Sequence, residues 1–186
     1  DALQTWGVNS RFQDLNLAKA RYSADRGDLR ALPTLESLVA DASQSNLMRA
    51  SIIEQLGNLG SRQLPSAAAM LLRSDSPILR ASAVRALGGV APVERYLMLR
   101  PFIKDTNLTV RMEVAQLLAG IPASELRPQD TADLEPLFEE YLAVQSDHLD
   151  MPSVQLQLAN FWINRGDSTK ATAALEEALR LNPQLE

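Results

Sequence analysis

Cysteine is absent from the 186 residues, and this excludes disulfides, thiolate metal sites, thiol nucleophiles and covalent haem attachment within the chain. Histidine occurs once, as His148, so a histidine-based metal site would need carboxylates from elsewhere in the fold. Asp147 and Asp150 flank His148 and offer at most a weak site for a cation. We therefore expect His148 to be an exposed side chain beyond a helix end.

Positive charge is scarce, and long apolar runs are missing. The net charge of −5 disfavours binding to a phosphate backbone. No run of about 18 apolar residues is available to span a bilayer, and the N-terminus lacks a signal-peptide pattern. With 46% apolar and 22% charged residues, the composition is that of a soluble globular protein. We expect no nucleic-acid partner and no membrane insertion, and the initial Asp leads us to expect a fragment of a longer protein.

Motifs for catalysis are also missing. The chain has no Gly-x-Ser-x-Gly elbow, no Gly-x-x-x-x-Gly-Lys-Ser/Thr loop and no dinucleotide-binding fingerprint. The adjacent acids Glu139-Glu140 and Glu176-Glu177 diverge by about 100° around a helix, so they cannot face each other as glycosidase carboxylates do. A single histidine excludes a di-iron centre built from repeated His-Glu pairs. We therefore expect no enzymatic activity, no metal and no cofactor.

An internal repeat is what the sequence does contain. Aromatic residues make up only 5%, so packing by Leu and Ala favours helices over sheets. Residues 47–59, 78–90 and 109–121 align without gaps at a spacing of 31 residues. The alignment superposes Arg49, Arg80 and Arg111, then Leu56, Leu87 and Leu118, then the small residues Gly57, Gly88 and Ala119.

Each repeat is predicted to be a helix pair. Apolar residues recur at helical spacing in the aligned segments, as Ile52, Ile53, Leu56 and Leu59 do in the first. The stretches 33–39, 65–72 and 93–103 carry a second apolar run bounded by Pro or a turn, which predicts the preceding helix of each pair. Asp75 and Asp105 stand in the turns between the two helices and could cap the second one. Such a pair cannot bury both apolar faces alone, so neighbouring pairs must stack.

The turn Asp, the aliphatic-Arg step and the Ala/Leu/Gly-rich second helix resemble HEAT repeats, especially the short bacterial type. The resemblance covers roughly residues 29–122. It implies that Arg49, Arg80 and Arg111 pair with the turn Asp of their own or an adjacent repeat. We interpret these arginines as a structural ladder rather than a row of ligand-binding residues.

The C-terminal third has a different period. Residues 123–133 are polar and are predicted to be a connector, and residues 134–144 form an amphipathic helix with Leu137, Tyr141 and Val144 on one side. From Pro152 onward the chain resembles one tetratricopeptide (TPR) unit. The matching positions are Leu158, Ala159, Trp162, Gly166, Asp167, Ala171, Leu175, Ala178 and Pro183. Gln155 departs from the usual Trp and Leu175 from the usual aromatic residue. Trp162 and Leu175 are expected to fill the space between the two helices.

The N-terminal stretch is predicted to open the stack. Phe12, Leu15, Ala18 and Tyr22 fall at helical spacing, and Gly27 follows where the helix would end. Trp6 and Phe12 could cap the end of the core or contact whatever precedes residue 1. We favour the capping role.

The predicted fold is all-α: a right-handed α-α superhelix, or solenoid, of HEAT-like helix pairs that continues into a TPR helix pair. Residues 1–28 form the capping helix, 29–122 about three HEAT-like pairs, 123–133 the connector and 134–186 the TPR-like helices. With chemistry excluded, shape remains, and a solenoid offers a curved surface. We expect a non-catalytic protein-protein interaction scaffold whose concave face binds a protein or peptide segment, or another domain of its parent chain.

The TPR resemblance implies which residues bind the partner, because the first helix of each unit faces the groove in that family. The corresponding positions are Leu156, Asn160, Ile163 and Asn164. Asn160 falls where carboxylate-clamp members carry Asn, but Leu156 stands where those members have Lys. We therefore expect mixed apolar and amide contacts rather than recognition of an acidic C-terminus.

The order of the segments resembles the C-terminal arm of bacterial multihaem c-type cytochromes with TPR and HEAT repeats. This implies an alternative function, the arm of a larger periplasmic electron-transfer protein. Cys-x-x-Cys-His motifs upstream of Asp1 in the parent gene would favour the alternative. On this resemblance we favour the periplasm over the cytoplasm.

Overall fold

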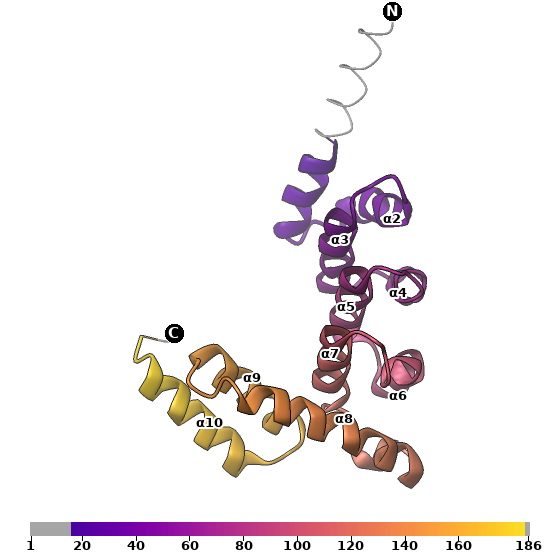
Figure 1. Ribbon diagram of the computed structural model, residues 1–186. Helices are drawn as coiled ribbons and strands as arrows, with labels where there is room; N and C mark the ends of the chain where they lie inside the picture. The colour runs from indigo at the N-terminus through magenta and orange to yellow at the C-terminus, as the bar shows by residue number, and fades with distance from the viewer. Residues whose placement is uncertain (1–15, 185–186) are drawn as a thin grey trace, which may run out of the picture. The chain divides into compact units, whose positions relative to one another are not determined.

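The computed structural model describes residues 16–184, and these residues form helices joined by short turns, with no strand among them (Figure 1). The predicted all-α class is confirmed. The expectations for Trp6, Phe12 and Leu15 lie outside the described residues. The chain divides into two compact units, one ending at Gly89 and the other beginning at Val90. The boundaries predicted at residues 28, 122 and 134 are left as predictions by this division.

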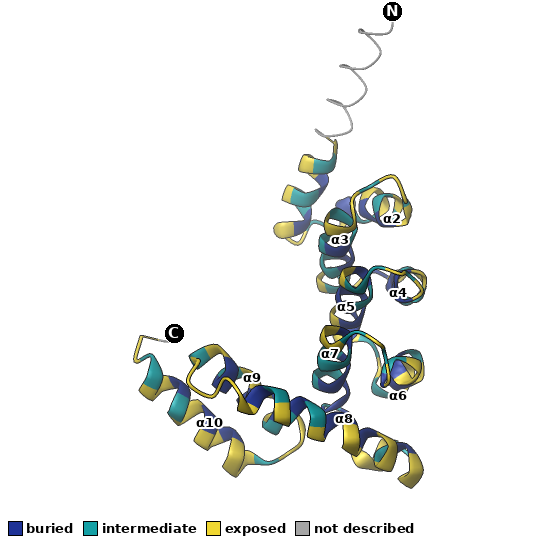
Figure 2. Cartoon of the chain, in the orientation of Figure 1, coloured by how far each residue is buried: buried dark blue, intermediate teal, exposed yellow. Residues whose placement is uncertain are grey.

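The first unit is built from two helix pairs that follow a helical stretch over residues 16–25. Its further elements are η1 (Leu29–Ala31), α2 (Leu32–Ala40), α3 (Asn46–Asn58), α4 (Leu64–Leu72), α5 (Pro77–Ala86) and η2 (Leu87–Gly89). Helix α2 packs on α3, α4 packs on α5, and α3 lies alongside α5. Figure 2 shows the buried residues on the facing sides of these helices.

The second unit contains three elements before its long helix and a helix pair after it. Its elements are α6 (Pro92–Leu99), η3 (Arg100–Phe102), α7 (Leu108–Leu118), η4 (Ala123–Glu125), α8 (Pro128–Ser146), α9 (Pro152–Asn164) and α10 (Ser168–Leu181). Helix α8 contacts both α7 and α9, and α9 packs along α10. The small side chains Ala171, Ala174 and Ala178 of α10 are buried, which permits close approach of the two helices.

The 31-residue spacing of the sequence is also the spacing of three helix starts. Helices α3, α5 and α7 begin at Asn46, Pro77 and Leu108, each 31 residues after the one before. Leu56, Leu87 and Leu118 therefore occupy the same position relative to their helix starts. Their exposed fractions are 0%, 0% and 1%, so their predicted burial is confirmed.

The repeated arginines bond to the main chain of the turn that precedes their own helix. Arg49 Nε donates to the Val39 carbonyl at 2.9 Å, and Arg80 Nη1 donates to the Ser74 carbonyl at 2.8 Å. Arg111 Nη1 donates to the Asp105 carbonyl at 2.7 Å. These bonds tie the start of each second helix to the turn before it, which is a structural role. The resemblance had pointed to turn carboxylates; these donors reach turn carbonyls.

The predicted helix caps need correction. Asn107 rather than Asp105 caps α7, because its side chain accepts from the Val110 N–H. Asp105 Oδ1 accepts one step earlier, from the Asn107 N–H at 2.8 Å. Helix α5 has no side-chain cap and begins at Pro77, whose missing N–H removes one group that a cap would satisfy.

Helix α8 begins at Pro128, so the predicted connector over residues 123–133 is wrong in its second half. Residues 128–133 lack the apolar spacing of an amphipathic helix, which is why the sequence did not indicate one. Their anchor is polar instead. Asp130 is buried, and Arg127 donates to its two carboxylate oxygens at 2.7 and 2.9 Å.

The aromatic core of the second unit differs from the prediction. Phe161 is 1% exposed and stacks on Tyr141 of α8 with 4.9 Å between ring centroids. Trp162 is only half-buried, and the Lys170 ammonium lies 4.1 Å from its ring centroid. Leu175 is 39% exposed, so the prediction that it fills the space between α9 and α10 was wrong. The alanines of α10 bring the helices too close for a large side chain there.

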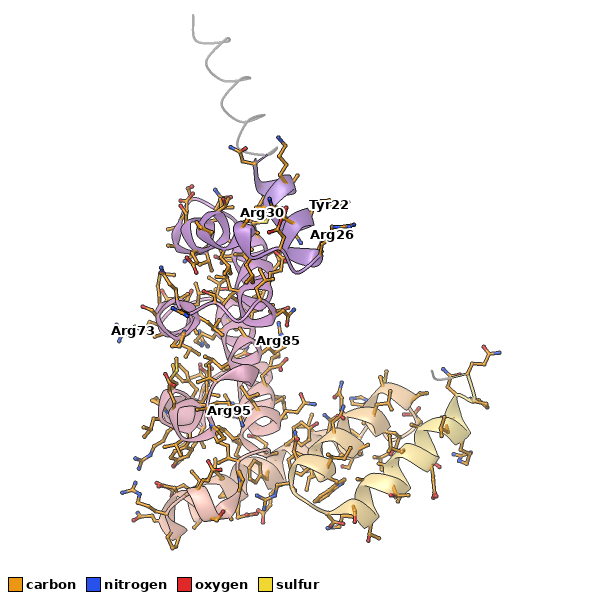
Figure 3. All side chains as sticks on the ribbon, turned by 180° about the vertical axis from the view of Figure 1, so that it is seen from behind. Tyr22, Arg26, Arg30, Arg73, Arg85 and Arg95 are labelled. Atoms are coloured by element: carbon orange, nitrogen blue, oxygen red, sulfur yellow. The ribbon has the colours of Figure 1, made fainter. Side chains whose placement is uncertain are left out.

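The first helical stretch buries a different face from the one predicted. Tyr22 is 66% exposed and Ala18 is exposed, whereas Ala20 and Ala24 are buried. Figure 3 shows Tyr22 beside Arg26, whose Nη1 lies 3.4 Å from the Tyr22 hydroxyl. The stretch is attached to α3 by polar bonds, such as that from Arg21 Nη2 to Ser51 Oγ at 3.0 Å. Gly27 ends it with a φ of +74°, as predicted.

Candidate functional site

Helix α9 carries all four residues of the predicted binding site. It starts with Pro152 at its first position and is followed by Gly166, whose φ of +75° turns the chain toward α10. One side of α9 is buried in the unit, through residues that include Val154, Leu158, Ala159 and Phe161. The predicted residues lie on the remaining surface of the helix.

The four residues share one face of α9 but differ in exposure. Their spacing of four, three and one residues puts them on one stripe of a helix. Leu156 is half-buried, Asn160 and Asn164 are exposed, and Ile163 is 55% exposed. An apolar side chain thus stands in the open between two amides that can each donate and accept hydrogen bonds.

Asn164 is the member of this group that meets another element. Gly120, just after α7, faces it so closely that a Cβ on Gly120 would lie 3.5 Å from Cγ and Oδ1 of Asn164. The structure therefore places the end of α7 beside the end of α9. Asn160 and Ile163 are left as the freely accessible part of the stripe.

Polar contacts hold α9 in place on both sides. Arg165 Nη2 donates to Glu135 Oε1 of α8 at 3.0 Å, and its guanidinium lies 4.7 Å from the Phe138 ring centroid. Gln155, the departure from the TPR pattern, is buried and donates to the Leu149 carbonyl at 2.8 Å. This bond fixes the turn between α8 and α9, so an amide at position 155 serves a purpose that Trp could not. The stripe on α9 is consequently presented by a rigid element.

The second unit also contains a groove that the sequence did not predict. Its volume is about 560 Å³. One wall comes from the segment after α6, with Arg100, Pro101, Ile103, Lys104 and Asp105. Helix α8 supplies the other wall, with Ala132, Asp133, Pro136, Leu137 and Glu140, and Arg111 of α7 closes the groove.

An ion pair fixes the closed end of this groove. Arg111 Nε donates to Glu140 Oε2 at 2.8 Å, and Arg111 Nη2 contacts Glu140 Oε1 at 2.5 Å. This hydrogen bond lowers the pKa of the Glu140 carboxyl and raises the pKa of the Arg111 guanidinium. Both side chains are therefore charged and committed to each other. A ligand in the groove meets a neutralised pair at this end.

The groove became visible only in three dimensions. Arg100 and Lys104 belong to a segment that was predicted as part of a helix, and Ala132 and Asp133 to one predicted as connector. The signal available in the sequence was Pro136, a proline within the predicted helix 134–144. A proline at such a position has a structural cost that calls for a reason.

Two further features bear on the chemistry of the described residues. Among residues 16–184, no group of three His, Asp or Glu side chains is placed to hold a metal ion, and this covers Asp147, His148 and Asp150. In the same range, no helix combines the length and the apolar character needed to cross a bilayer.

Comparison with protein-family models gives no match, and comparisons with curated proteins and with solved structures give none either. The HEAT-like and TPR-like resemblances therefore rest on the residues of this chain alone. They remain predictions, as does the superhelical arrangement of the helix pairs.

Proposed function

We propose that this chain is a non-catalytic protein-binding scaffold, a solenoid of HEAT-like helix pairs that continues into a TPR-like pair. Its partner is a protein or peptide segment that lies along the exposed stripe of α9. The proposal is carried by one observation: Ile163 is 55% exposed and stands between two exposed asparagine amides on a helix whose other side is packed.

The stacked arrangement in the first unit supports the scaffold. Helix α3 lies along α5, and each has its own partner helix, α2 and α4 respectively. Two helix pairs thus share their apolar surface through their second helices. This sharing is what a repeat array requires, since one pair cannot bury both of its apolar faces.

The chemistry of the α9 stripe supports a peptide ligand. Asparagine amides can pair with the N–H and C=O groups of a peptide backbone, and Ile163 and Leu156 offer apolar contact beside them. A rigid helix face loses little conformational entropy when it binds. The expected contacts are therefore mixed apolar and amide contacts along a single segment of the partner.

A peptide-display selection tests this proposal. The full chain is immobilised, and a library of random 12-residue peptides displayed on phage is panned against it. Selected sequences are synthesised with a fluorescent label, and their Kd values are measured by anisotropy. The double variant Asn160→Ala/Asn164→Ala is expected to weaken binding about tenfold, which corresponds to about 1.4 kcal/mol.

A matched control variant is available on the neighbouring helix. Thr172 and Glu176 of α10 are exposed and have the same four-residue spacing as the two asparagines. Thr172→Ala/Glu176→Ala should leave the Kd values within about twofold, and both double variants should keep the melting temperature nearly unchanged. Selection of no peptide, or equal Kd values for both variants at every peptide, would count against the proposal.

A further inference from the structure

We infer that the groove between residues 100–105 and α8 binds an acidic peptide segment, whose carboxylates meet Arg100 and Lys104 and whose backbone N–H reaches the Ala132 carbonyl. This inference rests on the proposed protein-binding function. It adds a second contact site in the same unit and the chemistry of the segment that occupies it.

The charges that remain available in the groove are predominantly positive. Arg111 and Glu140 neutralise each other, and Asp105 Oδ1 already accepts from the Asn107 N–H. Arg100 and Lys104 are exposed and make no hydrogen bond or ion pair within the described part of the chain. Asp133 on α8 opposes them, which leaves one positive charge in excess in a chain whose net charge is −5.

Pro136 adds an acceptor that distinguishes a peptide from a simple anion. It stands inside α8 and has no N–H, so the Ala132 carbonyl does not receive the helical hydrogen bond of an ordinary helix. Ala132 and Pro136 both line the groove. An inorganic anion has nothing to donate to this carbonyl, whereas a peptide offers a backbone N–H next to its acidic side chain.

Apolar surface between the charged groups completes the match. Pro101 and Pro136 are exposed at the rim, and Ile103 and Leu137 are buried beneath them. The volume of about 560 Å³ falls within the range of roughly 300–1,000 Å³ that ligand-binding pockets span. The segment that fits carries Asp or Glu beside apolar residues.

The peptide selection on the full chain tests this inference through its sequences and through one charge reversal. We expect the selected 12-residue peptides to be enriched in Asp and Glu next to apolar residues. Arg100→Glu/Lys104→Glu should weaken these peptides by about tenfold or more, because attraction becomes repulsion, and the loss should shrink in high salt. Arg100→Lys/Lys104→Arg, which keeps both charges, should keep most of the affinity.

A second charge reversal serves as the control. Arg62 and Arg73 are exposed arginines of the first unit, and Figure 3 shows Arg73 at the edge of the ribbon, pointing outward. Arg62→Glu/Arg73→Glu changes the net charge by the same amount and should alter the Kd values by no more than about twofold. Circular dichroism of each variant verifies that its helices are intact.

Pro136→Ala separates the acceptor from the charges. It restores the N–H that pairs with the Ala132 carbonyl, so it should weaken the acidic peptides several-fold while leaving the helical content intact. Unchanged affinity in this variant together with unchanged affinity in Arg100→Glu/Lys104→Glu would overturn the inference.

The outcomes also separate this inference from the proposed function. Acidic peptides that respond to the groove variants support both. Peptides without acidic residues, which respond only to Asn160→Ala/Asn164→Ala, overturn the groove as a binding site and leave the scaffold standing. If the library yields no binding peptide, both are overturned.

Discussion

Gly57 of α3 lies against the backbone of Ala86 at the end of α5, and a Cβ on Gly57 would stand 2.7 Å from the Ala86 carbonyl oxygen. Glycine inside a helix costs about 1 kcal/mol relative to alanine, so its presence needs a compensating contact. That contact is the close approach of two second helices. Gly57 therefore sets the distance at which consecutive helix pairs pack.

Gly57→Ala should destabilise the chain although alanine favours a helix. The clash is with backbone atoms that cannot rotate away, and overpacking of this kind costs about 1 to 3 kcal/mol, which exceeds the propensity gain. Urea denaturation of both proteins measures the difference. The control is Gly89→Ala, whose Cβ would meet no atom within 4 Å. A Gly57→Ala protein more stable than the parent would mean that α3 and α5 are not in this contact.

Leu87→Ala should lower the free energy of unfolding by about 2 to 5 kcal/mol, because it opens a cavity at a fully buried position. Leu47→Ala is the matched control, since Leu47 is 70% exposed and should cost under about 0.5 kcal/mol. Thermal and urea denaturation report both values. Similar losses for the two leucines would contradict the repeat register in which Leu56, Leu87 and Leu118 are equivalent.

Pro136→Ala should stabilise the chain. Proline inside a helix costs about 3 kcal/mol, and its stiffening of the unfolded chain recovers about 1 kcal/mol or less. Pro136 is exposed, so little packing is lost with its ring. We expect a gain of about 2 kcal/mol, measured by urea denaturation. A loss of stability would indicate that the Ala132 carbonyl has a partner in the folded chain that the proline makes possible.

Stability should decrease in acid through Asp130. The hydrogen bond from Arg127 lowers the pKa of Asp130 from 3.8 to about 2. A depressed pKa contributes stability that is present above the unfolded value of 3.8 and is lost as the pH falls through about 2. The melting temperature should therefore drop between pH 4 and pH 2.

Asp130→Asn isolates this contribution. The variant should be less stable at neutral pH and should show a shallower fall in melting temperature between pH 4 and pH 2. Asp28 and Asp41 also have pKa values of about 2, because Arg30 donates to the first and Gln44 and Ser43 donate to the second. Some acid dependence should consequently persist in the variant. An unchanged slope would exclude Asp130 as a source of it.

The helices of the first unit could be predicted because helical periodicity is a local property. Predicted stretches 33–39 and 65–72 became Leu32–Ala40 and Leu64–Leu72, and Gly27 ends the first helical stretch as expected. Burial of Leu56, Leu87 and Leu118 also follows from the repeat. Each of these features is encoded within a few turns of helix.

The errors concern features that depend on distant neighbours. Phe161 and Trp162 are adjacent in sequence, and which ring is buried depends on where α8 lies. Tyr22 fits an apolar stripe by spacing, but Ala20 and Ala24 make the contact because polar bonds orient the stretch on α3. Helix α8 starts at Pro128 because a buried ion pair, not an apolar pattern, anchors its first turn. The groove brings together segments whose approach no local pattern records.

The equal spacing of Asn46, Pro77 and Leu108 makes the length of this architecture adjustable only in whole steps. Duplicating residues 46–76 would return every downstream helix to its original rotational phase, and the new copy would bring its own glycine and its own leucine to the junction. Inserting one residue into α3 would instead rotate everything after it by about 100° and turn buried side chains toward water. Growth of such a chain by gene duplication is thus far easier than growth by small insertions.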